Sequence, residues 1–302
     1  MKKASVILSS ALVLGTLLAG CGNNNSNNAA ATNAPAESTA PAATAAASDA
    51  GTTEAGKYQD GTYYGTAPAD EKTGWESFVI LTVEGGKITK ADWDAFNVKN
   101  AGDLKKKVSE DGKYGLVSKG GGQAEWHEQA AKAEAFLVEK QDPAAVVVNG
   151  EGKTDAISGV SVGVSDFVTA SQAALAAGPT QAGPYKDGGY TAEGEMDKES
   201  GWKSTVAITV ADGNIVAANF SGVNAAGDDK KQYSIDGKYG MKAGGASAEW
   251  HEEIALAEKY FLDNKGAAPT IDAEGKTDAI SGVSIHVGEY FTLAEKALEG
   301  AK

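Results

Sequence analysis

Along the greater part of the chain, apolar side chains recur with two different periods, and these periods predict an alternation of strands and helices. A period of two marks strands with one buried face, as at Val206, Ile208 and Val210. A period close to 3.6 marks helices with one buried stripe, which is the spacing seen from Trp250 to Phe261. The pattern therefore predicts an α+β fold.

The expected elements follow the same order twice. Each set has a short strand, then two longer strands joined as a hairpin, then a middle helix and a last helix. In the first set these elements begin near residues 61, 77, 88, 126 and 165. In the second set they begin near residues 189, 205, 215, 250 and 288. The dipeptide Asp212-Gly213, between two expected strands, is a strong signal for a hairpin turn.

The order of elements repeats because the sequence itself repeats. Four blocks occur twice: Gly74-Trp75 and Gly201-Trp202, residues 111–115 and 236–240, residues 124–128 and 248–252, and residues 151–161 and 274–284. The last block, Glu-Gly-Lys-Thr-Asp-Ala-Ile-Ser-Gly-Val-Ser, is identical in its two occurrences. We expect a tandem duplication of two small domains with antiparallel sheets and helices, copy 1 (residues 57–178) and copy 2 (residues 184–302), joined by a Gly/Pro linker.

The N-terminal end has a different character. Residues 1–20 combine a positive start with an apolar run that is too short for a comfortable membrane span, and they lead into Cys21. This end resembles the lipobox of bacterial lipoproteins, which implies that Cys21 is lipidated and that the protein is extracytoplasmic and anchored to the cell membrane. The alternative is an ordinary secretory signal with an incidental cysteine. Residues 21–56 read by composition as a disordered stalk.

Composition narrows the possible chemistry. The chain has 302 residues, of which 27 are basic and 41 acidic, for a net charge of −14, and every basic residue is lysine. Such an acidic chain is a poor binder of nucleic acid, which requires a cationic face. One cysteine excludes an internal disulfide and a cysteine metal site, and three histidines offer little for any metal. We expect neither a nucleic-acid partner nor a metal centre.

The repeated eleven-residue block is the candidate for chemistry. It places a lysine, a carboxylate, a glycine and hydroxyls just before the last helix, and the N-terminus of a helix favours phosphate. Its side chains show no pattern that demands core burial, and the alternative interpretation is a turn in which Ser or Asp caps the helix. The candidate residues are Lys153, Asp155, Ser158, Gly159 and Ser161, with Lys276, Asp278, Ser281, Gly282 and Ser284 in copy 2.

The ends of these blocks, Asp155–Ser161 and Asp278–Ser284, resemble the flavinylation motif of the FMN-binding domain family. That family includes flavin subunits of sodium-pumping and Rnf-type oxidoreductases, and two-domain surface lipoproteins of Gram-positive bacteria. The resemblance implies one FMN per copy, held as a phosphoester on Ser161 and Ser284 by a flavin transferase. It also implies a redox donor at the membrane and an extracellular acceptor, and hence an electron carrier rather than an enzyme that converts a substrate.

The sequence departs from the family pattern at two positions in both copies. Val160 and Val283 replace an alanine, and the terminal serine of each block replaces a threonine. Serine keeps the nucleophilic oxygen, whereas we expect the bulkier valine to obstruct the transferase or the flavin. The alternative function is a flavin-free surface module, for binding or structure, that kept the fold. The signal peptide is also a conceivable source of a pheromone.

Three kinds of aromatic and charged feature remain. Trp126 and Trp250 begin the middle helices, where each indole would either stack on a flavin ring or anchor the core. The histidine that follows each of them would move protons or lie on a wetter face. The lysine clusters at 105–107 and 230–231 are interpreted as solvated charges in a loop.

Overall fold

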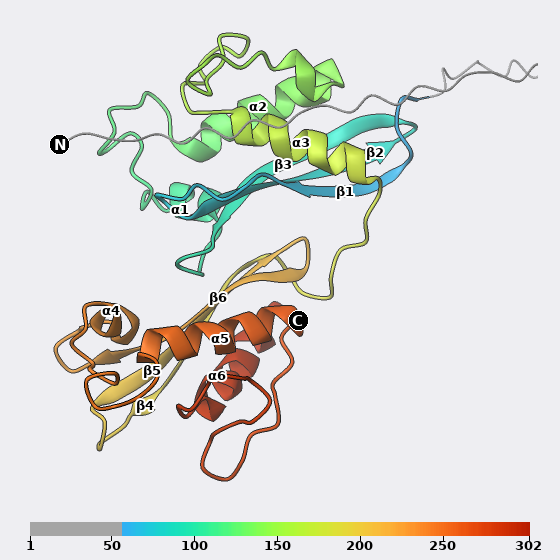
Figure 1. Cartoon of the computed structure of the whole chain (residues 1–302). Coiled ribbons are helices and arrows are strands. Elements are labelled where there is room, and N and C mark those ends of the chain that lie inside the picture. Colours follow the sequence, from blue (N-terminus) through green and yellow to red (C-terminus); the bar gives the residue numbers. More distant parts are fainter. Residues whose placement is uncertain (1–55) are drawn as a thin grey trace, which may run out of the picture. The chain divides into compact units, whose positions relative to one another are not determined.

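The computed structural model describes residues 56–302, in which each copy forms a three-stranded antiparallel sheet with its two longer helices packed against it (Figure 1). This confirms the expected α+β class, in two tandem units. The expected signal peptide, Cys21 and the stalk up to residue 55 lie outside the described residues. Among residues 56–302, no helix combines the length and apolar character that crossing a membrane requires.

Copy 1 has the sheet order β1-β2-β3, with α2 against β3 and α3 against β1 and β2. Its helices begin where the periodicity predicts, at Trp126 and Ser165. The elements of copy 1 are β1 (Gly61–Thr66), β2 (Trp75–Glu84), β3 (Lys87–Asn97), α1 (Lys105–Glu110), α2 (Trp126–Lys140), a short 3-10 helix (Pro143–Ala145) and α3 (Ser165–Ala177).

Copy 2 repeats this plan with the sheet order β4-β5-β6. Helix α5 packs on β6, and α6 packs on β4 and β5. The elements of copy 2 are β4 (Gly188–Met196), β5 (Trp202–Ala211), β6 (Asn214–Asn224), α4 (Lys230–Ile235), α5 (Trp250–Asp263), α6 (Gly288–Leu298) and a 3-10 helix (Glu299–Ala301).

The hairpin turns show how closely the copies correspond. Asp212 and Gly213 have φ angles of 48° and 68°, and Gly85 and Gly86 have angles of 59° and 72°. Two consecutive left-handed residues suit the tight turns whose twist matches that of the strands. The predicted hairpin at Asp212-Gly213 is confirmed, and the register of each hairpin shifts at the equivalent place, next to Thr82 in copy 1 and Thr209 in copy 2.

Each copy has its own aromatic core, and the tryptophan that begins its middle helix belongs to it. Trp126 and Trp250 are both 2% exposed. The Trp126 ring lies 5.0 Å from the Trp93 ring between centroids, and the Trp250 ring lies 6.0 Å from the Tyr290 ring. The interpretation of these tryptophans as core anchors is confirmed, and they fix where each middle helix sits on its sheet.

The lysine clusters are not solvated loops, so that expectation is wrong. They begin the short helices α1 and α4, and Lys106 forms ion pairs with Asp92 on β3 and with Glu134 on α2. The Lys106 Nζ to Glu134 Oε1 distance is 2.7 Å. Carboxylates from two other elements, absent from the local sequence window, draw Lys106 against the domain, whereas Lys107 is exposed.

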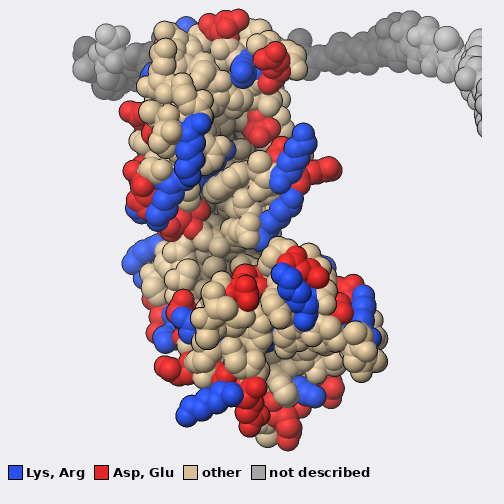
Figure 2. All heavy atoms as spheres, turned by 90° about the vertical axis from the view of Figure 1, so that its left-hand side faces the viewer, with Lys and Arg blue, Asp and Glu red and all other residues tan. Residues whose placement is uncertain are grey.

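Other lysines lie at the surface among carboxylates. Figure 2 shows one face of the molecule, on which Lys and acidic side chains are interspersed. Exposed examples are the pairs Lys242–Glu252 and Lys259–Asp263, each with an N to O distance of 2.6 Å. Pairs of this kind contribute little to stability individually. Their effect is to distribute the charges of an acidic chain.

The start of α5 is tied to the loop before it by one side chain. Glu249 caps the helix, and its carboxylate also accepts hydrogen bonds from the backbone N–H groups of Met241 and Lys242, both at 3.0 Å. Glu125 does the same for copy 1. This carboxylate therefore positions the loop that carries Tyr239.

We predict that Glu249→Ala lowers the free energy of unfolding by about 1–2 kcal/mol, because a helix cap and two loop hydrogen bonds lose their acceptor. Urea unfolding of the mature chain measures the loss, and amide hydrogen exchange of residues 241 and 242 should accelerate. Glu249→Gln keeps one of the two acceptor oxygens and should recover only part of the loss. Unchanged exchange in the alanine variant would contradict the assigned role.

Candidate functional site

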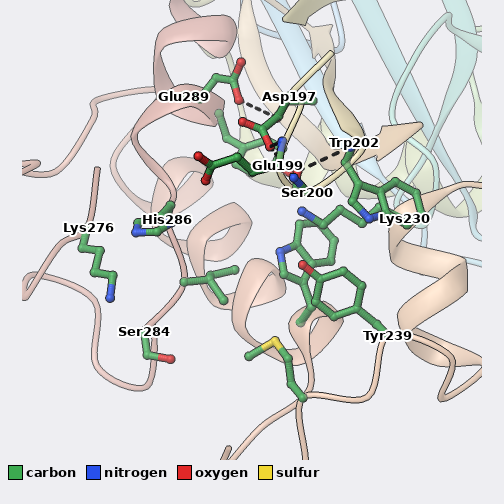
Figure 3. A pocket seen from close by; sticks show the side chains of 15 residues that line it. Asp197, Glu199, Ser200, Trp202, Lys230, Tyr239, Lys276, Ser284, His286 and Glu289 are labelled. Atoms are coloured by element: carbon green, nitrogen blue, oxygen red, sulfur yellow. Dashed lines mark hydrogen bonds between the residues drawn. The ribbon is translucent and has the colours of Figure 1, made fainter. Parts of the chain in front are cut away.

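The four repeated blocks meet in copy 2 around one cavity of about 520 Å³ (Figure 3). Trp202 comes from the first block, Tyr239 from the second and Trp250 from the third. Lys276 and Ser284 come from the eleven-residue block. Segments that are far apart in sequence and identical in both copies thus share one location.

The cavity has two chemically different sides. In Figure 3, Lys276, Ser284 and His286 lie on one side, and Lys230 and Tyr239 lie on the other. The first side offers a hydroxyl with cationic and imidazole groups, and the second offers aromatic faces around an amine. The carboxylates that also line the cavity are Asp197, Glu199 and Glu289.

The amine of Lys230 is enclosed by three aromatic rings. Its Nζ lies 4.6 Å from the Trp250 ring centroid, 5.4 Å from that of Tyr239 and 5.9 Å from that of Trp202. The residue is 9% exposed. An ammonium over a ring face within about 6 Å is attracted by the negative charge of that face. Three rings together therefore replace part of the hydration that Lys230 loses.

Copy 1 contains the same arrangement around Lys105. Its Nζ lies 4.6 Å from the ring centroid of Trp126, 5.0 Å from that of Tyr114 and 5.5 Å from that of Trp75. Lys105 stands first in α1 as Lys230 stands first in α4. The lysine enclosed by three rings is thus a property of the domain and not of one copy.

Burial changes the acid–base behaviour of both lysines. It lowers the pKa of the Lys230 ammonium to about 8, with a partial opposing effect from the negative charges of Glu289 and Asp197. Burial likewise lowers the pKa of Lys105 to about 8, opposed by carboxylates of which Asp166 has the largest effect. Each amine therefore carries most of its positive charge at neutral pH and can release its proton in mild base.

The eleven-residue block is anchored by every third side chain. Thr154, Ile157 and Val160 are buried, so the expectation that this block carries no burial pattern is wrong. Val160 belongs to the core of copy 1, and Val283 packs against the core of copy 2 without lining the cavity. Both valines therefore pack against the cores, and obstruction of the transferase or the flavin stays a prediction.

A glycine carbonyl near the start of each block is hydrogen-bonded to the start of the last helix. The Gly152 oxygen accepts hydrogen bonds from the N–H groups of Val164, at 2.7 Å, and of Ser165, at 3.3 Å. The Gly275 oxygen does the same at the start of α6. Val164 takes the N-cap position and has no side-chain cap. The interpretation of the block as a Ser or Asp cap is wrong, and two N–H groups at the start of the helix are already bonded to a carbonyl rather than open to a phosphate.

The candidate serines are oriented by the middle helix. Ser161 donates from its N at 2.7 Å and from its Oγ at 3.2 Å to the Gln129 amide oxygen. Ser284 donates from its N and, at 3.1 Å, from its Oγ to the carboxylate of Glu253. Both serines are exposed, while Gln129 and Glu253 are each 1% exposed. A buried polar side chain thus holds an exposed hydroxyl in a defined place.

The remaining candidates are exposed and lie outside the cavity of copy 2. Gly159 and Gly282 have left-handed φ angles of 74° and 85°, which turn the loop between the buried positions. Lys153 is exposed, with its Nζ 3.8 Å from a carboxylate oxygen of Glu151. The other exposed candidates are Asp155, Ser158, Asp278 and Ser281. The structure therefore brings together Ser284, Lys276 and Trp250, but not the whole block.

The histidines after the tryptophans are engaged elsewhere. The Nδ1 atoms of His127 and His251 each lie 2.9 Å from a buried serine hydroxyl, on Ser109 and Ser234. His251 does not line the cavity, whereas His286 does. Within the described part of the chain, no three histidine or carboxylate side chains are grouped to hold a metal ion.

Sequence reasoning did not nominate Lys230, Trp202, Tyr239, Gln129 or Glu253. Trp202 and Tyr239 stand in blocks that both copies share, so their recurrence was an available signal. Lys230 was hidden inside a charged cluster. Gln129 and Glu253 were not noticed because they occupy one position of the repeat at which the two copies have different residues.

No protein-family model and no curated protein matches the chain. A solution NMR structure from Clostridium thermocellum has 47% sequence identity and a TM-score of 0.32, over 39% of this chain and 91% of that one. A crystal structure from Clostridium perfringens has 28% identity and a TM-score of 0.30, over 39% of this chain and 88% of that one. Neither is named for an activity, a ligand or a partner.

We predict that the stability of the protein depends on pH through Lys230. Its pKa is about 8 in the fold and 10.5 ordinarily, so the unfolded chain holds more protons between these values. Stability then rises with pH in that window. Relative to Lys230→Met, the wild-type free energy of unfolding should increase by up to about 3 kcal/mol from pH 7 to pH 10.

Urea unfolding of the mature chain at several pH values measures this trend. Lys105→Met should show the same direction of change for copy 1. A constant difference between wild type and Lys230→Met from pH 7 to pH 10 would show that the buried amine keeps its ordinary proton affinity.

Proposed function

We propose that the protein is a membrane-anchored, extracytoplasmic electron-transfer lipoprotein that binds FMN, one in each copy, through a serine phosphoester. The observation that carries the proposal is that all four blocks retained in both copies contribute side chains to a single cavity.

The residues around the cavity fit FMN in size and chemistry. A volume of about 520 Å³ lies within the range of roughly 300–1,000 Å³ that is usual for small-molecule sites. Ser284 offers a hydroxyl for the phosphate, and Lys276 offers a cation on the same side. Trp202 and Tyr239 offer apolar faces for a flat ring system. In copy 1, Ser161, Lys153, Trp75 and Tyr114 are the corresponding residues.

Bound FMN would supply reversible electron transfer. The contribution of the chain is electrostatic, because Lys230 holds a proton on Nζ in a partly dehydrated setting at neutral pH. A fixed positive charge there favours the gain of negative charge by a neighbouring group. Glu289, which accepts a hydrogen bond from Ser204 at 2.7 Å, lies in the same lining and moderates that charge.

The proposed partners follow from the sequence resemblance. A flavin transferase would load the serines, a redox donor would act at the membrane, and an acceptor would lie outside the cell. The lipid on Cys21 would keep the protein near its donor. The protein would then carry electrons and convert no substrate of its own.

We predict that the mature protein from its own host carries covalent flavin. Its intact mass should exceed that of the polypeptide by one or two increments of FMN less water, and its absorbance should show a flavin. The double variant Ser161→Ala with Ser284→Ala should lose the covalent flavin. Covalent flavin in that variant would place the attachment elsewhere, and a colourless wild type made alongside the transferase would favour the flavin-free surface module.

We further predict that Lys230→Gln lowers the reduction potential of flavin attached at Ser284. Loss of one positive charge near the ring should shift the potential negatively by on the order of 30 mV or more. Spectroelectrochemistry of the chain with Ser161→Ala isolates the flavin of copy 2, and the flavin mass increment should remain. If the flavin reduction potential of the variant equals that of the parent, Lys230 does not lie near the flavin.

A further inference from the structure

We propose that the two copies are unequal acceptors of flavin and that Ser161, in copy 1, is the preferred attachment site. This inference rests on the proposed function and assigns the modification to one of two similar serines. It is carried by two positions on the middle helix, three residues apart, at which the copies differ in charge. Both positions contact the block that contains the serine.

The first position is the side chain that orients the serine. In copy 1 the neutral amide of Gln129 receives Ser161, and its nitrogen donates to the Ala124 carbonyl at 2.9 Å. In copy 2 the acidic Glu253 takes this place and receives the N–H and Oγ of Ser284 and the N–H of Ile285. The hydrogen-bond pattern is therefore retained while a formal negative charge is added directly beneath the hydroxyl.

The second position lies one turn further along the helix. In copy 1, Lys132 places its Nζ 3.3 Å from the Gly159 carbonyl oxygen, over the turn that leads to Ser161. In copy 2, Leu256 covers the equivalent turn, and its Cδ1 would lie 3.1 Å from a Cβ added to Gly282. Leu256 is 39% exposed, so an apolar side chain has replaced a lysine at an exposed position.

Together these changes make the surroundings of Ser161 more positive than those of Ser284 by two formal charges. The other charged residues of the block are identical in the two copies. His286, which stands where copy 1 has Gly163, adds no formal charge at pH 7. Within the block and the two helix positions that contact it, the charge difference therefore comes from the helix.

Attachment of flavin adds negative charge at this point. The Oγ of serine attacks the phosphorus that bears riboflavin in a flavin dinucleotide. A new O–P bond forms, the pyrophosphate P–O bond breaks, and a nucleoside monophosphate leaves with the electron pair. The serine proton passes to a base in solution or on the transferase. The serine thereby gains a phosphodiester anion, which Lys132 attracts and Glu253 repels.

The strength of these charge interactions decides whether a preference for Ser161 over Ser284 can be measured. Two unit charges a few ångströms apart near a protein surface interact strongly enough to change an equilibrium by tenfold or more. With an attraction on one side and a repulsion on the other, we expect at least tenfold more flavin on Ser161 than on Ser284 when the transferase is limiting.

The test is peptide mapping by mass spectrometry of the full mature chain, made with limiting amounts of its flavin transferase. The ratio of flavin on the Ser161 peptide to flavin on the Ser284 peptide should be at least ten. The reciprocal exchange of Gln129→Glu and Lys132→Leu with Glu253→Gln and Leu256→Lys should invert that ratio.

Two single variants guard against misfolding of the exchanged chain. Leu256→Lys and Lys132→Leu change exposed side chains, so both should fold, and each should move the ratio severalfold in the expected direction. Equal labelling, or an excess on Ser284, overturns the inference and leaves the proposed function intact. Flavin on neither serine overturns both.

Discussion

The interaction on which the site depends is the enclosure of one lysine ammonium by three aromatic rings. The rings that surround Lys230 come from a strand, a loop and a helix, which must all be in place before the charge can leave water. A buried charge without such partners would strongly destabilise the fold. The lysine therefore couples the sheet, the loop after the short helix and the middle helix into one arrangement, and the cavity lies against it.

A large part of the fold was predictable because it depends on local patterns. The alternation along residues 205–210 gave a strand, and the spacing from Trp250 to Phe261 gave a helix with a buried face. The starts of the last helices, at Ser165 and Gly288, were also found. The repeat strengthened each assignment, since the same pattern had to arise twice. These features lie within windows of ten to fifteen residues.

The site was only partly predictable, because its residues meet through tertiary contacts. Ser284 and Trp250 stood in repeated blocks and were nominated as cofactor-binding candidates, and both line the cavity. Lys230 was misread because a lysine pair usually faces solvent, and only the folded chain brings rings around it. The direction of Val160 was likewise set by the core rather than by its neighbours in sequence. Trp202 has a counterpart in copy 1, Trp75, and this recurrence was the signal that would have added it to the rings around the lysine.

The carbonyl of Gly152 gives the eleven-residue block the properties of a cassette. Because it bonds the N–H groups of Val164 and Ser165, the start of the block is held against the start of the last helix. The chain enters and leaves at fixed points, so the exposed positions between the buried side chains of the block can change without moving the sheet or the last helix. A duplicated protein built in this way can retain one loop and diversify the other, and its two halves can specialise while their scaffolds stay alike.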